Sequence, residues 1–139
     1  MIAIRSLREL TLQECRQLLC TACVGRLAFT EEGRPAIHPV NFLMDHDDVV
    51  IRTGRSAKLA AAEHSKVLAF EVDEIDPDTR TGWSVLVVGR ASVVGDIDEL
   101  VALATSDRRP WVSGPKEYFV RIKGDRITGR RLNLDQPDF

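Results

Sequence analysis

The apolar run at residues 83–94, Trp-Ser-Val-Leu-Val-Val-Gly-Arg-Ala-Ser-Val-Val, constrains the fold more than any other segment of this chain. Its valine content favours a β-strand, because β-branched side chains pack well on a pleated surface. Gly89 lies inside the run, and a glycine inside a strand often marks a tight bend. The run is therefore predicted to form one long, bent strand that turns the corner of a β-barrel.

Shorter strand-like segments, separated by turn residues, surround this run. They lie at residues 25–30, 34–44, 49–53, 67–72, 118–123 and 126–132. The turn at 31–33 predicts a tight hairpin between the first two segments, and Gly124-Asp125 predicts a hairpin between the last two. The polar residues 73–80 are expected to form an exposed connection, and residues 106–116, which include Trp111, a loop.

Three short helices are predicted among these strands. Thr11 and Glu14 have the spacing of a capping box, which places a helix at residues 11–21. Ser56 and Asp96 are the expected N-caps of helices at 56–63 and 96–105. Strands without regular βαβ alternation predict a mainly β fold, an antiparallel barrel of six or seven strands with a few helices outside it. We expect a single domain over residues 1–139.

Composition excludes several classes of partner. The formal net charge of -2 and the pI near 5.9 provide no general basic field, so we do not expect nucleic acid binding. The sequence contains no uninterrupted apolar run of roughly 18 residues and no leader pattern at its start. We therefore expect a cytoplasmic protein that does not enter a membrane.

The cysteines Cys15, Cys20 and Cys23 form an odd set within one short segment, which does not suit a disulfide framework. No second Cys pair follows and the histidines are dispersed, so no metal site is expected. The cysteines are predicted to be small buried residues on a helix face, with one of them exposed.

A cation-rich turn follows the strand at 49–53 and is the clearest candidate for a binding site. Arg52, Thr53, Arg55, Ser56 and Lys58 lie within seven residues of one another. Cations, hydroxyls and the N–H groups of a helix start are all satisfied by an anion, so the turn predicts a phosphate site. A solvated turn between a strand and a surface helix is the alternative.

Six motifs then occur in one order along nearly the whole chain. They are Gly-Arg-Leu-Ala-Phe at 25–29, Pro-Val-Asn-Phe at 39–42, Ile-Arg-Thr-Gly-Arg-Ser-Ala-Lys at 51–58, Phe-Glu-Val-Asp at 70–73, Gly-Trp-Ser-Val-Leu-Val-Val-Gly-Arg at 82–90 and Ile-Thr-Gly-Arg-Arg at 127–131. In this order they resemble the pyridoxamine 5′-phosphate oxidase-like flavin-binding split-barrel proteins, in particular the small members related to nitroimidazole-resistance proteins.

The resemblance implies a homodimer that binds FMN, or in some members F420 or haem, between its subunits. It implies that the backbone of one strand lies along the flavin ring, and that strand contains Ile37, His38, Pro39, Val40, Asn41 and Phe42. Lys58 resembles the phosphate-binding lysine of the family, with Arg52, Thr53, Arg55 and Ser56 around it.

Four later residues complete the expected site. Ser84 resembles a flavin-contacting position, and Trp83 would pack near the edge of the cofactor. Arg130 and Arg131 resemble a basic pair that approaches the ligand from the partner subunit. The alternatives are a core position for Trp83 and a solvated strand face for the two arginines.

The implied activity is that of a flavin-dependent oxidoreductase that transfers electrons between NAD(P)H and a small electron-poor substrate, such as a nitroaromatic or a quinone. The alternative is a non-catalytic protein that stores, senses or delivers flavin, F420 or haem. Oxidation of vitamin B6 is not expected, because the true oxidases are longer and carry extra basic residues for the phosphate of that substrate, which this sequence does not show. Ala57 stands where the oxidase has a second cation, so the resemblance implies that phosphate binding depends on Lys58, Arg52 and Arg55. No side chain is identified as a catalytic acid, base or nucleophile, so the cofactor would carry the chemistry.

Overall fold

The strands and helices alternate irregularly along the chain in the computed structural model, which describes residues 4–104 and 118–134. The elements are β1 (Ile4–Glu9), α1 (Leu12–Thr21), β2 (Val24–Glu31), β3 (Arg34–Asp45), β4 (Asp48–Thr53), α2 (Ala57–Glu63), β5 (Val67–Asp76), β6 (Thr81–Val93), α3 (Ile97–Ala104), β7 (Tyr118–Ile122) and β8 (Arg126–Leu134). The expected loop at 106–116, with Trp111, lies outside the described residues.

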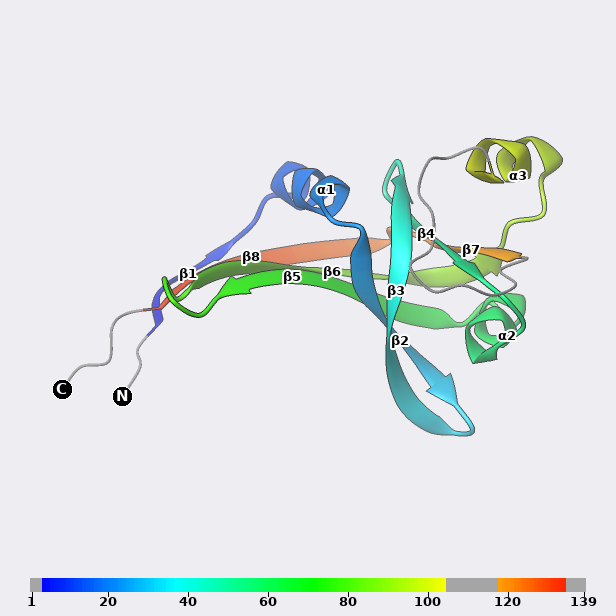
Figure 1. The fold of residues 1–139 in the computed structure, drawn as a ribbon, viewed down its shortest axis with the longest axis horizontal. Helices are drawn as coiled ribbons and strands as arrows, with labels where there is room; N and C mark the ends of the chain where they lie inside the picture. Colours follow the sequence, from blue (N-terminus) through cyan, green and yellow to red (C-terminus); the bar gives the residue numbers. More distant parts are fainter. Residues whose placement is uncertain (1–3, 105–117, 135–139) are drawn as a thin grey trace.

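Six of the strands close into an antiparallel barrel. The order is β6-β5-β2-β3-β4-β7, and a second pairing between β7 and β6 closes the ring. β8 and β1 extend the sheet from β6 beyond the barrel, as Figure 1 shows at its left-hand side. The predicted fold class, a mainly β antiparallel split barrel with helices outside it, is confirmed.

The strand β6 holds the barrel and the extension together. Its first part pairs with β8, and its last residues, Ala91 to Val93, pair with β7. Gly89 lies at the change between them, where a Cβ atom would be only 1.7 Å from the carbonyl oxygen of Lys123. The predicted long strand that turns a barrel corner at Gly89 is confirmed, and only glycine fits at that corner.

Two predictions about strands were wrong, and one strand was not predicted. The last two strands do not form a hairpin, because β7 and β8 both pair with the same edge of β6, one after the other. β5 continues through the expected connection to Asp76, where its acidic residues still pair with β6. The strand β1 was not expected, and it pairs with β8 at the outer edge of the extension.

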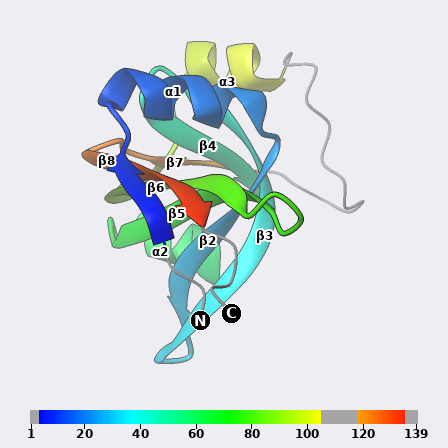
Figure 2. The same ribbon diagram turned by 90° about the vertical axis from the view of Figure 1, so that its left-hand side faces the viewer.

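The helices begin where the capping residues predicted. Thr11 and Glu14 form the capping box of α1, the Ser56 hydroxyl accepts a hydrogen bond from the N–H of Leu59, and Asp96 accepts one from the N–H of Glu99. α1 and α3 lie on the same side of the strands in Figures 1 and 2, and α2 lies lower, beside the barrel end of β6. Within the described residues, no helix is long and apolar enough to cross a membrane.

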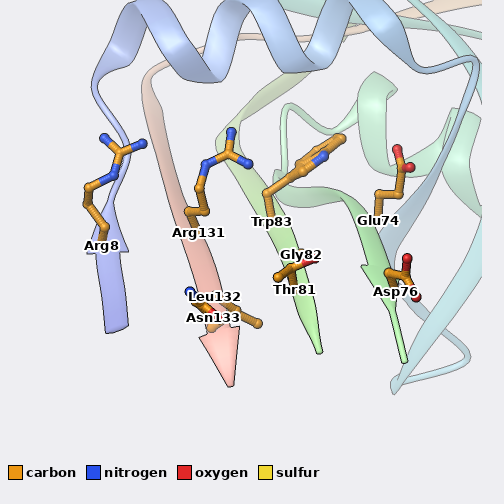
Figure 3. A pocket seen from close by; sticks show the side chains of 9 residues that line it. All are labelled: Arg8, Glu74, Asp76, Thr81, Gly82, Trp83, Arg131, Leu132 and Asn133. Atoms are coloured by element: carbon orange, nitrogen blue, oxygen red, sulfur yellow. The ribbon is translucent and has the colours of Figure 1, made fainter. Parts of the chain in front are cut away.

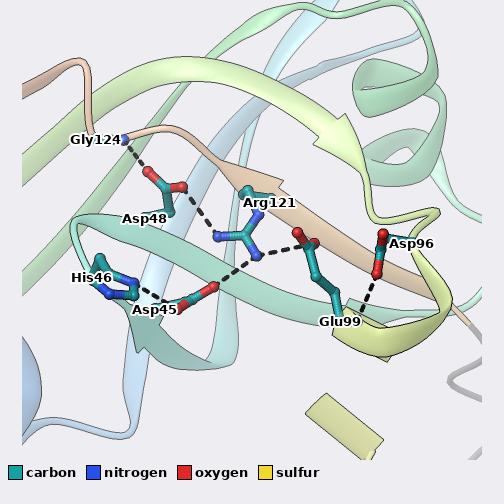
Figure 4. A network of polar contacts seen from close by, with 7 residues as sticks. All are labelled: Asp45, His46, Asp48, Asp96, Glu99, Arg121 and Gly124. Atoms are coloured by element: carbon teal, nitrogen blue, oxygen red, sulfur yellow. Dashed lines mark hydrogen bonds and ion pairs between the residues drawn. The ribbon is translucent and has the colours of Figure 1, made fainter. Parts of the chain in front are cut away.

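A small apolar cluster and an ion-pair network attach α3 to the barrel. Leu100 and Leu103 pack on Val50 and Phe119, outside the main core. Beside them the Arg121 guanidinium donates hydrogen bonds to Asp45 at 2.8 Å and Asp48 at 3.1 Å, and it pairs with Glu99 on α3 at 3.4 Å (Figure 4). This arrangement joins β3, β4, β7 and α3.

The cysteines differ from their predicted burial. All three are free thiols, and Cys15 on α1 is buried against β8 beside Gly129. Cys20 and Cys23 are both exposed, whereas only one exposed cysteine was expected. The reason is that Cys20 lies on the outer side of α1, and Cys23 follows the end of the helix.

Within residues 4–104 and 118–134, one face of the extended sheet is not covered by a helix. Cross-strand partners share a face, and register places several exposed apolar side chains on the face away from the core. Ile37 is 65% exposed there, and the other members are Leu7, Val67, Ile75 and Leu86. We call this face of the sheet the outer sheet face.

Candidate functional site

The strands β3 and β4 separate at the point where the sequence predicted a cofactor. Their pairing ends at Phe42 and Ile51. From Arg34 to Asn41, β3 pairs with β2, and no other described strand pairs with its second edge. A strand edge of this kind presents backbone donors and acceptors to a ligand.

The six predicted residues of β3 divide between the two faces of the strand. His38, Val40 and Phe42 lie on the barrel side, where Phe42 is buried against Phe70. Ile37, Pro39 and Asn41 lie on the outer sheet face. This division suits a backbone contact with a ligand better than contact through all six side chains.

The hydroxyls of the cation-rich turn maintain its shape. Thr53 is buried, and its hydroxyl lies 3.0 Å from that of Ser56 and 3.2 Å from the carbonyl oxygen of Gly54. Ser56 in turn caps α2. Both hydroxyls thus have partners inside the turn.

Each cation of the turn lies over an aromatic ring. The Arg52 guanidinium is 5.3 Å from the centre of the Phe119 ring, and that of Arg55 is 5.7 Å from Tyr118. The Lys58 ammonium is 5.3 Å from the centre of the Phe29 ring. Cation–π contacts position a cation and contribute no negative charge of their own. The sequence does not predict these three rings, because they come from β2 and β7 and only the folded barrel brings them to the turn.

Trp83 and Ser84 are neighbours on β6 and therefore face opposite sides of the sheet. Trp83 pairs with Arg131 and Ser84 with Arg130, so the two arginines also lie on opposite faces. Trp83 is 8% exposed and belongs to the core cluster. It lines a cavity of about 470 Å³ with Arg8, Arg131, Glu74 and Asp76 (Figure 3). Ser84 and Arg130 line a separate cavity of about 370 Å³.

The structure does not bring all predicted site residues together in one chain. The cation-rich turn leads into α2, which lies beside the barrel end of β6 (Figure 1). Trp83 and Ser84 are the third and fourth residues of β6 and therefore lie near its other end. The eight residue steps from Trp83 to Ala91 span on the order of 26 Å of strand. Ser84 and Arg130 therefore lie far from the cation-rich turn of their own chain.

The sequence also did not predict one cluster of titratable side chains on the outer sheet face. Arg26 on β2 donates to Glu71 at 2.9 Å and to Asp73 at 2.8 Å, both on β5. Burial and the neighbouring Asp73 carboxyl raise the pKa of Glu71 to about 7, although Arg26 opposes this. Alternation along a single strand predicts that Glu71 and Asp73 share a face, but the position of Arg26 depends on the pairing of distant strands.

The structure is thus an antiparallel β-barrel in which the pair β3 and β4 separates beside the cation-rich turn. The pyridoxamine 5′-phosphate oxidase family model matches residues 11–131. The chain belongs to this family.

Three similar proteins illustrate the relationship. The protein Rv0080 of Mycobacterium tuberculosis is 39% identical over 136 residues, which cover 94% of this chain and 89% of that protein. A Corynebacterium glutamicum structure whose description refers to pyridoxamine 5′-phosphate oxidase has a TM-score of 0.80 and 32% identity, and the match covers 94% of this chain and 96% of that one. An FAD-binding protein from Mycobacterium smegmatis has a TM-score of 0.72 and 31% identity, with 90% and 97% covered.

Proposed function

We propose that this protein binds a flavin nucleotide, with the phosphate at the cation-rich turn and the ring along residues 37–42 of β3. The observation that carries the proposal is the position of Lys58, Arg55 and Arg52 beside the strand edge that β4 leaves at Phe42. A flavin nucleotide needs an anion clamp and backbone groups for its ring edge. This turn and this strand edge provide both kinds of group.

The residues of the turn have different roles in this proposal. Lys58 contacts the phosphate directly, and Arg55 and Arg52 add positive charge around it. Thr53 and Ser56 keep the turn in shape through their mutual hydroxyl contact. The backbone of β3 positions the ring.

Ser84 and Arg130 join the site from a second copy of the chain. They lie on the outer sheet face, as do Ile37, Pro39 and Asn41. Contact between the outer faces of two copies would bury the exposed apolar side chains and bring Ser84 and Arg130 of one copy toward β3 of the other. Trp83 and Arg131 lie on the opposite face, so the proposal does not assign them to the flavin.

Sedimentation tests the homodimer. We expect a species of twice the 15.5 kDa chain mass at micromolar concentration. A monomer under these conditions would exclude a site completed by the second copy.

The identity of the cofactor is tested by the absorption spectrum and mass of the small molecule that purifies with the protein. The sequence favoured FMN, and the FAD bound by the similar M. smegmatis protein makes FAD the second candidate. Both carry a phosphate on the ribityl chain, so the same turn serves either one. Recovery of F420 or haem, or of no cofactor even after incubation with flavins, would contradict the proposal.

The bound flavin would accept and donate electrons, and the protein would provide binding, orientation and electrostatics. We propose transfer from NAD(P)H to a small electron-poor acceptor such as a quinone or a nitroaromatic. Steady-state oxidation of NAD(P)H by the flavin-loaded protein, with and without the acceptor, tests this activity. Tight flavin binding without turnover would instead support a protein that stores or delivers the cofactor.

A further inference from the structure

The cavity beside Trp83 has no role in the proposed function. Its volume of about 470 Å³ lies within the range of roughly 300–1,000 Å³ that is typical of small-molecule sites. Trp83 and Arg131 line it, and they lie on the face of the sheet opposite to Ser84 and Arg130. A ligand in this cavity is therefore separated by the sheet from the outer sheet face, through which a second copy would complete the flavin site.

Strand register places four side chains in one row across this cavity. Arg8 on β1 pairs with Arg131 on β8, Arg131 pairs with Trp83 on β6, and Trp83 pairs with Glu74 on β5. Cross-strand partners share a face, and Figure 3 shows these four side chains in a row on the side of α1. The row consists, in order, of two cations, an indole ring and a carboxylate.

The charges on the two sides of the indole ring lack partners. Arg8 is already paired, because its guanidinium donates to both carboxylate oxygens of Glu14, at 3.1 and 3.0 Å. Within residues 4–104 and 118–134, neither Arg131 nor Glu74 forms an ion pair. Trp83 stands between these two residues in the row, and Arg8 beside Arg131 is an unfavourable pair of like charges. An anionic group bound at Arg131 would offset that repulsion.

The opposite side of the cavity is acidic. Asp76 also lines it, two residues after Glu74 on β5, so both carboxylates lie on the same face of that strand (Figure 3). Asp76 pairs with Thr81, and Thr81 pairs with Asn133, which add polar groups at the border of the cavity. The cavity is thus basic toward β8 and acidic toward β5.

Trp83 provides an apolar surface between the two charged sides. Its side chain is 8% exposed and packs in the main core, which fixes its position. Adjacent strands lie about 4.7–4.9 Å apart, so the backbones of Arg131 and Glu74 are separated by roughly 10 Å across β6. An aromatic ring that stacks on Trp83 can direct one substituent toward each of them when the substituents are in para positions.

We propose that this cavity binds a small planar aromatic acid that carries an amino group at the opposite end of its ring. The carboxylate accepts hydrogen bonds from Arg131, the ring stacks on Trp83, and the amino group donates to Glu74. This site is separate from the flavin site and does not depend on it.

Titration with three related compounds, followed by the NMR chemical shifts of the protein, tests the site. The compounds are 4-aminobenzoate, benzoate, which lacks the amino group, and aniline, which lacks the carboxylate. We expect 4-aminobenzoate to bind about tenfold more tightly than either of the others, because each of them loses one hydrogen bond to a charged side chain. Equal affinities for 4-aminobenzoate and benzoate, or no binding of 4-aminobenzoate, would overturn the proposal.

Two variants at exposed positions assign the contacts. Arg131→Leu should weaken the binding of both acids by about tenfold, whereas Glu74→Ala should reduce the affinity for 4-aminobenzoate to that for benzoate and leave benzoate unchanged. Arg126→Leu is the matched control, because Arg126 is an exposed cation of β8 that does not line the cavity. Equal losses in Arg126→Leu and Arg131→Leu would show that binding follows net charge, and the proposal would fail.

A titration in the presence of saturating FMN separates this site from the flavin site. The affinity for 4-aminobenzoate should not change, because the cavity and the outer sheet face lie on opposite sides of the strands. Displacement of 4-aminobenzoate by FMN would assign the compound to the flavin site and overturn the proposal. The titrations without FMN decide the proposal even if the protein binds no flavin.

Discussion

The Nζ atom of Lys58 lies 5.3 Å from the centre of the Phe29 ring, so a residue of β2 positions the cation that the sequence assigned to phosphate binding. Phe29 is 5% exposed, and the edge of its ring also meets His38 on β3 at a centroid distance of 4.9 Å. The contacts of Phe29 with His38 and with Lys58 therefore connect the proposed ring segment to the proposed phosphate site.

Phe29→Leu should weaken the binding of FMN more than that of riboflavin. A cation–π contact contributes about 0.5–1 kcal/mol, which corresponds to roughly a twofold to fivefold change in affinity. Titration of both flavins measures the difference, and riboflavin, which has no phosphate, controls for any general loosening of the fold. The same loss for both ligands would mean that Phe29 acts on the barrel and not on Lys58.

Gly89→Ala should be among the most destabilising single changes in the described chain. The new Cβ would lie 1.7 Å from the carbonyl oxygen of Lys123, so β6 and β7 must move apart. We expect a loss of about 3 kcal/mol or more in the free energy of unfolding, measured by chemical denaturation. Gly95→Ala is the control, because apart from its chain neighbours nothing lies within 4 Å of its Cβ position, and its effect should stay within about 1 kcal/mol. Similar values for the two variants would contradict the described corner.

Much of this fold follows from local patterns in the sequence. The capping residues Thr11, Ser56 and Asp96 predicted where the helices begin, because capping depends on residues close in sequence. The valine run with Gly89 predicted the long bent strand for the same reason.

The wrong predictions concern partners that are distant in sequence. Gly124-Asp125 has the form of a hairpin turn, yet Gly124 is required for another reason. A Cβ there would lie 2.1 Å from the carbonyl oxygen of Asp47, and the N–H of Gly124 donates to Asp48 at 3.0 Å. The acidic end of β5 looked like a connection, because its strand character comes from pairing with β6 beyond the barrel.

The candidate site likewise has one part that local sequence patterns predict and one part that depends on residues distant in sequence. The cations of the turn could be identified from residues 52–58 alone. The opposite faces of Trp83 and Ser84 also follow from strand alternation, once β6 is recognised. The aromatic rings beneath the cations, and the Arg26 contact with Glu71, depend on the order of strands in the closed barrel. No local pattern contains that information.

Arg121→Leu should destabilise the protein by about 2–3 kcal/mol, because Asp45, Asp48 and Glu99 would lose their shared cation. The Arg121 side chain is only 14% exposed. Arg16→Leu is the control, since the Arg16–Asp47 pair is well exposed and should contribute at most about 1 kcal/mol.

This effect should depend on pH. Arg121 holds the pKa of Asp45 below its ordinary value, so the stabilisation is present above the unfolded pKa and is lost as pH falls through the folded one. The difference between wild type and Arg121→Leu in chemical denaturation should therefore shrink in acid. A difference that is constant from neutral to acidic pH would contradict the described network.

Glu71→Gln should stabilise the protein more at alkaline than at acidic pH. Burial and Asp73 raise the pKa of Glu71 from 4.5 to about 7. A raised carboxyl pKa favours the folded state at low pH, and that advantage is lost as pH rises from the unfolded value through the folded one. The gain in melting temperature from Glu71→Gln should therefore grow between about pH 4.5 and pH 7 and then level off. A gain that does not change with pH would show that Glu71 titrates near its ordinary value.

The central claim, that the cation-rich turn binds a flavin phosphate through Lys58, is tested most directly by titrating wild type and Lys58→Ala with FMN and with riboflavin. A charge-assisted contact contributes about 1.5–3 kcal/mol, so FMN affinity should fall by roughly tenfold or more in the variant. Riboflavin, which lacks the phosphate, should bind wild type poorly and bind both proteins almost equally. Equal losses for FMN and riboflavin, or an unchanged FMN affinity in Lys58→Ala, would contradict the account.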